Sequence, residues 1–248
     1  MTTTDYIAVI DGSTSKTENK LSHTMTNGRY CMLMVSDYIL SADKNMSCED
    51  FCCGVSEHIR KHYKESQLEQ LFKHPIERPT ASCAIYSNYR RQVWMIGDCQ
   101  CMIDGNYYDN PKPNEAVIAN KRSKYAKKLL SDGIATINDL QVNDLSRQYI
   151  INDLITSTNG QNLDYSVIDG FEIPIDKVKV ISIPEKTKTI ILASDGYPYL
   201  KPTLKETEQA LLNQMKSDPL NIYFFKATKG LLAGNNSFDD RTYIRFVP

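Results

Sequence analysis

The chain has 248 residues, 41% of them hydrophobic, with 29 basic and 30 acidic residues and a formal net charge of -1. A chain of this size can bury a core without disulfide or metal staples. The balanced charge argues against a nucleic-acid-binding or membrane-surface protein, and no apolar run approaches the ~20 residues of a bilayer span.

The seven cysteines are irregularly spaced, and no two of them form a CxxC pair. This pattern predicts no zinc site and favours reduced thiols in the core of a cytoplasmic protein. The N-terminal residues MTTTDYIAVIDG lack a basic start followed by an apolar run, so we expect no secretory signal.

The first part of the chain predicts mainly strands. Residues 5–11 form a strand candidate that ends at Gly12, and the apolar residues 29–40 fit one or two further buried strands. Ser47 begins a helical pattern, with Asp50 three residues later in a capping-box arrangement. Residues 82–87 and 91–96, joined by a tight turn and followed by CQCMIDGNYY, predict a hairpin or meander.

The rest of the chain predicts helices, strands, helices and a last strand. Residues 114–130 predict a helix whose basic face is either solvated or a docking surface for an acidic partner. That face comprises Lys121, Arg122, Lys124, Lys127 and Lys128. A second helix is predicted over 139–155, strands over 178–183 and 189–193, helices over 204–215 and 219–228, and a closing strand over 242–247.

The strands are mostly joined by short turns, which favours antiparallel pairing in a layered α+β fold. The chain contains no internal repeat, no low-complexity tract and no linker rich in proline, glycine and serine. We therefore predict a single domain over residues 1–248.

Aspartates recur at the ends of the apolar strand candidates. Asp11-Gly12 follows YIAVI, Asp98 follows VWMIG, Asp195-Gly196 follows TIILAS, and Asp239-Asp240 precedes TYIRFV. One Asp-Gly at a strand end is usually a plain turn. Four acidic sites, each tied to an apolar strand, favour a shared role.

Carboxylates gathered at one end of a sheet repel one another, and divalent cations relieve this repulsion. Hard oxygen ligands suit Mg²⁺ or Mn²⁺. A glycine after the aspartate lets the backbone turn sharply and brings a carbonyl close to the ion. The pattern therefore indicates a site for two metals, a type of site that supports hydrolysis.

The ordered motifs AVIDG, TASCAIYS, WMIGDCQ, ILASDGYP and FDDRTYI resemble those of the metal-dependent protein phosphatases of type 2C. The resemblance spans nearly the whole chain. No single motif is specific, but their order is. It implies a four-layer α-β-β-α sandwich of two antiparallel sheets flanked by helices, with the metals at one end between the sheets.

The resemblance assigns roles to five residues. Asp11 matches the aspartate that bridges both metals, and Gly12 matches the residue whose carbonyl contacts the second metal. Asp195 and Asp239 match ligands of the first metal. Asp98 matches an aspartate that helps to hold a weaker third metal in some members.

The sequence departs from the family at several places. Ser13 to Lys16 replace the usual glycine-containing segment after Asp-Gly, Cys99 replaces a serine, and Asp240 stands where asparagine is usual. The N-terminal strand that carries an acidic pair in the family is missing, because only Met1 to Tyr6 precede the first motif strand.

The resemblance implies hydrolysis of phosphomonoesters, by default phosphoserine and phosphothreonine in proteins, by a water that bridges two Mn²⁺ or Mg²⁺ ions. Asp11, Asp195 and Asp239 would be the catalytic residues. Lys16 is a candidate contact for the substrate phosphate, or else a surface lysine. The expected partners are phosphoproteins modified by a serine/threonine kinase, with no nucleic acid and no membrane.

Two alternatives stay open. The chain could be a catalytically weak or inactive phosphatase-like scaffold, since the acidic pair is missing. It could also be an actin-like or sugar-kinase-like ATPase, because VIDGSTSK resembles the phosphate loop of that class. The absence of a second Asp-x-Gly element and of a glycine-rich adenosine element argues against the ATPase.

Overall fold

The computed structural model describes all residues from Met1 to Pro248. The chain divides into two compact units, each built from separated segments. Unit 1 contains residues 1–112, 158–194 and 242–248, and unit 2 contains residues 113–157 and 195–241. The single domain over residues 1–248 stays a prediction.

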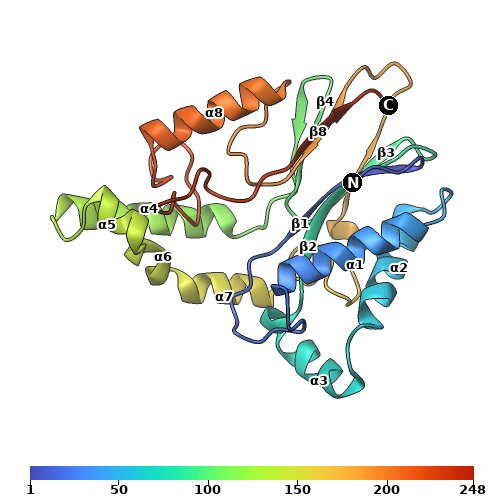
Figure 1. Ribbon diagram of the computed structural model, residues 1–248, viewed down its shortest axis with the longest axis horizontal. Coiled ribbons are helices and arrows are strands. Elements are labelled where there is room, and N and C mark those ends of the chain that lie inside the picture. The colour runs from blue at the N-terminus through green and yellow to red at the C-terminus, as the bar shows by residue number, and fades with distance from the viewer. The chain divides into compact units, whose positions relative to one another are not determined.

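Unit 1 contains two four-stranded antiparallel sheets (Figure 1). Sheet A has the order β1-β2-β3-β6 and sheet B the order β5-β4-β7-β8. The strands are β1 (Tyr6–Gly12), β2 (Ala81–Ser87), β3 (Gln92–Ile96), β4 (Gln100–Ile103), β5 (Asn106–Tyr108), β6 (Lys179–Ser182), β7 (Ile190–Ala193) and β8 (Tyr243–Phe246). The helices are α1 (Asn27–Ser41), α2 (Cys48–Arg60) and α3 (Glu65–Lys73), with 3₁₀ turns at Pro75–Glu77 and Ile175–Lys177.

Alternate residues of sheet A enter two different cores. Ala84 and Met95 join a cluster with Cys101 and Leu192 of sheet B, which packs the two sheets face to face. The intervening residues of the same strands face the helices. All seven residues of β2 are buried, because this strand is covered on both faces.

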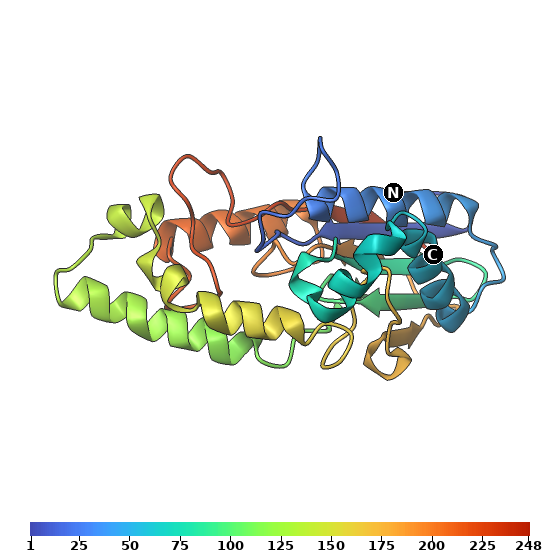
Figure 2. The same ribbon diagram turned by 90° about the horizontal axis from the view of Figure 1, so that it is seen from below.

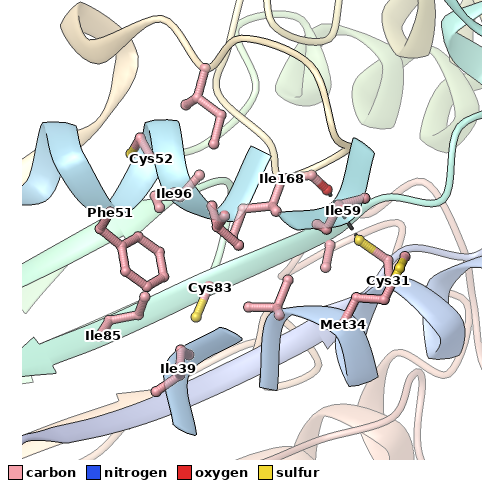
Figure 3. Packing of buried hydrophobic residues seen from close by; sticks show 14 of the residues in the cluster. Cys31, Met34, Ile39, Phe51, Cys52, Ile59, Cys83, Ile85, Ile96 and Ile168 are labelled. Carbon is pink, nitrogen blue, oxygen red and sulfur yellow. Dashed lines mark hydrogen bonds between the residues drawn. The ribbon is translucent and has the colours of Figure 1, made fainter. Parts of the chain in front are cut away.

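Helices α1 and α2 pack on the outer face of sheet A (Figures 1 and 2). Figure 3 shows this core, in which Phe51 of α2 lies against Ile85 of β2. The buried thiol of Cys31 in α1 donates a hydrogen bond to the carbonyl of Ile168 at 3.3 Å. The α+β class and the two packed antiparallel sheets are therefore confirmed.

The N-terminal residues fold back along the free edge of β1. The Met1 ammonium donates to the carbonyl of Ala8 at 2.7 Å, and the Ala8 N–H donates to the Met1 carbonyl at 3.0 Å. Thr2 forms an isolated bridge with Ile7. A short antiparallel segment thus extends sheet A beside β1, where the sequence was expected to lack the N-terminal strand of the family.

A buried ion pair joins the 158–171 segment to the start of β2. Arg78 contacts Asp169 at 2.9 Å, and both side chains are almost fully buried. Gln161 and Asn162 also donate hydrogen bonds to Asp169. The Phe171 N–H donates as well, so four donors use the acceptor sites of this carboxylate and fix the segment that pairs with Ala81 through Ile168.

Unit 2 is helical. Its helices are α4 (Glu115–Ser131), α5 (Ile137–Val142), α6 (Leu145–Tyr149) and α8 (Leu204–Ser217), together with most of α7 (Ile151–Asn159). A small core joins α4 to the segment after α8, through residues such as Ala126 and Ile222. Arg122 of α4 is fully buried and contacts Asp144 at 2.7 Å, with the Leu220 carbonyl as another acceptor at 2.8 Å.

Several predicted elements are confirmed. The strands at 5–11, 82–87, 91–96, 178–183, 189–193 and 242–247 are present within a residue or two of the expected bounds, as are the helices at 114–130 and 204–215. Ser47 caps α2 in a capping box with Asp50. All seven cysteines are free thiols, and no helix is both long and apolar enough to span a membrane.

The strand predicted over 29–40 is wrong, because α1 occupies this segment. Its buried residues Cys31, Met34, Val35 and Ile39 recur at helical spacing. Further apolar residues fall between them, and the continuous run hid this period. Thr26 caps the helix by accepting the N–H of Arg29 at 3.4 Å.

Two predicted helices differ as well. The helix over 139–155 is interrupted, because Asp144 caps a new helix by accepting the Arg147 N–H at 3.0 Å. The helix over 219–228 is absent, because the buried carboxylate of Asp218 accepts the N–H groups of residues 222–224. Arg122, predicted on the basic face, is buried instead.

Removal of the Arg122 charge tests the buried pair of unit 2. We expect Arg122→Met to lower the free energy of unfolding by about 3–5 kcal/mol, because Asp144 would remain buried without its partner. The measurement is urea unfolding followed by circular dichroism. Lys124→Met, on an exposed position of the same helix, should change it by less than about 0.5 kcal/mol. Equal losses of unfolding free energy in the two variants would contradict the burial of the Arg122–Asp144 pair.

Candidate functional site

Two predicted ligands lie together at one end of sheet A in unit 1. Asp11 lies directly opposite Ser82 in the pairing of β1 with β2, and Gly12 lies opposite Ala81. The Ser82 hydroxyl donates a hydrogen bond to Asp98 at 2.5 Å. Ser82 therefore links the end of β1 to the turn between β3 and β4.

A lysine neutralises the carboxylate of Asp98. Lys112 contacts its other oxygen at 2.5 Å, and the Asp98 side chain is only 11% exposed. Burial alone would raise the pKa of Asp98, but the charge and hydrogen bond of Lys112 and the Ser82 hydroxyl outweigh it and hold the pKa below its usual value. Asp98 is therefore ionised near neutral pH.

Glycine at position 12 permits a close backbone approach. A Cβ atom on Gly12 would lie 2.3 Å from the carbonyl oxygen of Gly28 in the first turn of α1. The intervening loop is anchored by buried Asn27, which accepts the Leu21 N–H and donates to the Asn19 carbonyl. These contacts hold the start of α1 against the end of β1. Lys16 lies in the loop between them.

Sheet B contributes two residues to the same end of unit 1. Gln100 pairs with Ala193 where β4 begins and β7 ends, and its side chain donates to the Ser194 carbonyl at 3.2 Å. The Ser194 N–H donates to the Thr242 carbonyl at 3.1 Å, and the Thr242 N–H donates to the Ser194 hydroxyl at 3.0 Å. The two points at which the chain enters and leaves the 195–241 segment are therefore side by side.

Unit 2 brings the other predicted ligands together. A Cβ atom on Gly196 would lie 2.1 Å from the carbonyl oxygen of Asp240, so the Asp195-Gly196 turn packs against the Asp239-Asp240 pair. Asp195 is exposed and Asp239 is partly buried. The Asp240 N–H donates to the Asp239 carboxylate at 3.0 Å.

Two further contacts hold these acidic segments. Lys229 forms an ion pair with the second oxygen of Asp239, and both side chains are about one third exposed. Arg241 donates two hydrogen bonds to Glu208 of α8, at 2.9 and 3.0 Å, and the Tyr197 hydroxyl donates a third at 2.6 Å. Glu208 thus clamps the residues that follow both acidic motifs.

The donor set fits a hard divalent cation in its chemistry. Asp11, Asp98, Asp195 and Asp239 offer carboxylate oxygens and Gly12 offers a carbonyl, which are the ligands that Mg²⁺ and Mn²⁺ prefer. Asp98 and Asp239 each already neutralise one positive charge, that of a lysine ammonium. In the structure, no three acidic, histidine or cysteine side chains lie close enough together to hold one ion.

The structure therefore joins the predicted residues in two sets. Asp11, Gly12 and Asp98 belong to unit 1, and Asp195 and Asp239 belong to unit 2. The meeting of both sets around common ions stays a prediction, as does the contact of Lys16 with phosphate.

Sequence reasoning missed three residues of these sets, namely Ser82, Lys112 and Lys229. Ser82 could have been found from the register of the hairpin that was predicted. The two lysines lie in loops far from their partners in sequence, and no local pattern indicates them.

No protein-family model matches the chain, and no curated protein matches it. Among solved structures, it is similar to the serine/threonine phosphatase of S. agalactiae, with 14% identity over 98% of this chain and 87% of that chain and a TM-score of 0.42. It is also similar to the phosphatase Stp1 of Staphylococcus aureus, with 12% identity, 85% and 78% coverage and a TM-score of 0.40. The catalytic domain of PstP in complex with two manganese ions gives 12% identity, 84% and 85% coverage and a TM-score of 0.35. All three are described as serine/threonine phosphatases.

The contact between the two acidic motifs of unit 2 can be tested at Gly196. We expect Gly196→Ala to destabilise the protein by more than about 2 kcal/mol, because its methyl group would overlap the Asp240 carbonyl and force the backbone to move. Gly105 has a positive φ and no atom near the position of a Cβ. Gly105→Ala should therefore cost about 1 kcal/mol from backbone strain alone. The measurement is urea unfolding of both variants, and a cost at Gly196 no larger than at Gly105 would refute the close contact.

The Glu208 clamp predicts a pH dependence of stability. The hydrogen bonds from Arg241, with that from Tyr197, hold the pKa of Glu208 below its usual value against the effect of burial. The stabilisation is therefore present above the usual glutamate pKa of about 4.3 and is lost as the pH falls through the lower folded value.

We expect Glu208→Gln to lower Tm relative to the natural chain near neutral pH, and the difference in Tm to shrink as the pH is lowered toward about 3. Thermal unfolding across this range measures the effect. Glu185→Gln, at an exposed turn position, should give little difference at any pH. A Tm difference for Glu208→Gln that does not change with pH would refute the predicted linkage.

Proposed function

We propose that this chain is a metal-dependent hydrolase of phosphomonoesters, acting on phosphoserine and phosphothreonine in proteins. The observation that supports this function best is the arrangement around Ser82. This residue lies opposite Asp11 and hydrogen-bonds Asp98, and so holds two strand-end carboxylates at the same end of the sheet.

The chain connects the two sets of residues directly. Ser194, the last residue of the 158–194 segment of unit 1, accepts a hydrogen bond from Gln100, which lies two residues after Asp98. The peptide bond keeps the backbone of Asp195 within about 3.8 Å of Ser194. In unit 2 the contact of Gly196 with Asp240 then ties Asp239 to Asp195.

Each residue has a proposed part in the chemistry. Bound divalent cations would supply Lewis acidity and neutralise charge on the phosphoryl group. Asp11 would hold both ions, the Gly12 carbonyl the second ion, Asp195 and Asp239 the first ion, and Asp98 a weaker third one. Lys16, on the loop anchored by Asn27, would orient the phosphate as a point charge.

No side-chain nucleophile is part of this proposal. Burial raises the pKa of the Cys31, Cys83 and Cys101 thiols, which keeps them protonated and poorly reactive. Phosphoprotein substrates would come from a serine/threonine kinase, and a cytoplasmic location remains part of the prediction.

A second candidate function is a phosphatase-like scaffold without turnover. The observation that favours it is the pairing of Lys112 with Asp98 and of Lys229 with Asp239, because both carboxylates are neutralised without a metal. A scaffold would give no hydrolysis at saturating Mn²⁺.

The proposal predicts that Asp11→Asn and Asp195→Asn each reduce Mn²⁺-dependent hydrolysis of p-nitrophenyl phosphate by about 100-fold or more, because each removes a carboxylate that would hold the ions. Circular dichroism and Tm should show that both variants remain folded.

Asp176→Asn provides the matched control. Its side chain is 73% exposed in a 3₁₀ turn, so activity should stay at the level of the natural chain. Full activity in either Asp11→Asn or Asp195→Asn would rule out the proposed site.

A further inference from the structure

Two lysines contact candidate metal ligands in the same way. Lys112 lies 2.5 Å from Asp98, and Lys229 is ion-paired with Asp239. One pair belongs to unit 1 and the other to unit 2, so the arrangement arises independently in two parts of the chain.

Both lysines are placed by fixed backbone. Lys112 stands between Pro111 and Pro113, whose rings restrict the local dihedral angles. Lys229 precedes Gly230, and a Cβ atom on Gly230 would lie 3.0 Å from the buried guanidinium of Arg122. The backbone at both lysines is therefore held in place, within reach of the carboxylates that they contact.

An ammonium group and a divalent cation compete for the same carboxylate oxygens. Lys112 and Ser82 use both oxygens of Asp98, and Lys229 and the Asp240 N–H use both oxygens of Asp239. Each oxygen keeps a second lone pair, so a divalent cation at either carboxylate would bind beside an ammonium charge and be repelled by it unless the lysine contact opens. Lysine suits such an exchange, because its strongly hydrated charge sits on a flexible stem.

Lys112 also has a second partner available. Its ammonium group lies 5.8 Å from the centre of the Tyr165 ring, within range of a cation–π interaction. The charge can thus leave Asp98 without losing all favourable contacts.

We propose that Lys112 and Lys229 are internal counter-cations that regulate metal binding by competing with divalent cations for Asp98 and Asp239. This inference rests on the proposed function. The lysines neutralise Asp98 and Asp239 and help to keep the chain folded when metal is scarce. They also raise the metal concentration that is needed to occupy these carboxylates.

The test measures Mn²⁺ binding by the full chain, using isothermal titration calorimetry and the electron paramagnetic resonance signal of free Mn²⁺. Lys112→Met and Lys229→Met should each bind Mn²⁺ about tenfold more tightly than the natural chain, since a competing charge is removed. Both should have a lower Tm without metal, and Mn²⁺ should raise their Tm more than it raises that of the natural chain.

Lys121→Met is the matched control, because it removes the same charge from an ion pair with Asp153 that involves no candidate ligand. Its Mn²⁺ affinity should equal that of the natural chain. Lys112→Arg and Lys229→Arg keep the positive charge and should also leave the affinity low. Lys112→Gln keeps a hydrogen-bond donor to Asp98 and replaces Lys112→Met should that variant fail to fold.

Unchanged Mn²⁺ affinity in the charge-removing variants would overturn the inference, even if the natural chain hydrolyses p-nitrophenyl phosphate and the proposed function stands. Tighter Mn²⁺ binding in these variants would support it, even if no form of the protein shows hydrolysis and the proposed function fails. An absence of Mn²⁺ binding in every form would overturn both.

Discussion

A carboxylate that is removed from water must be neutralised, and this chain uses two different cations for the purpose. Arg78 and Arg122 pair with Asp169 and Asp144, where the side chains on both sides are almost fully buried. Lysines pair with the carboxylates of Asp98 and Asp239 near the strand ends, where more solvent reaches the pair. Arginine offers a rigid fork of donors and keeps its charge, whereas lysine is a mobile point charge. The interior pairs therefore fix the fold, and the pairs near the strand ends can exchange.

The burial of β2 determines where the acidic residues of unit 1 lie. Because each face of this strand packs in a different core, a slip by one residue would exchange its side chains between the two cores and disrupt their packing. That register places Ser82 opposite Asp11 and within reach of Asp98. A serine hydroxyl at this position can serve the carboxylate and still be accommodated in a buried strand, since its hydrogen-bonding needs are met.

The elements that the sequence predicted well are those whose signals are local. Ser47 and Asp50 predict the start of α2 because they form a capping box. Two apolar runs around a short turn predict the hairpin of β2 and β3. The failures have non-local or competing causes. The apolar residues between the buried positions of α1 obscured its period, and Asp218 removed the N–H groups that a helix after it would need.

The residues of the candidate site also divide into those with local signals and those without. The strand-end aspartates could be predicted from the sequence because each stands next to an apolar run. Lys112 and Lys229 could not, because their partners lie 14 and 10 residues away along the chain and the contacts depend on the tertiary fold. The clamp formed by Glu208 and Arg241 likewise joins residues 33 positions apart.

The pairing of β7 with β8 has a consequence for how the protein is made. Ile190 is paired with Phe246, so sheet B gains its edge strand only after the entire 195–241 segment has been synthesised. Strands β1, β2 and β3 of sheet A, by contrast, lie within the first 96 residues. On the ribosome, sheet A can begin to form early, while the edge of β7 stays unpaired until β8 has left the exit tunnel. During that interval the nascent chain carries an unprotected strand edge, the feature through which chaperones and aggregation compete for newly made β-sheet proteins.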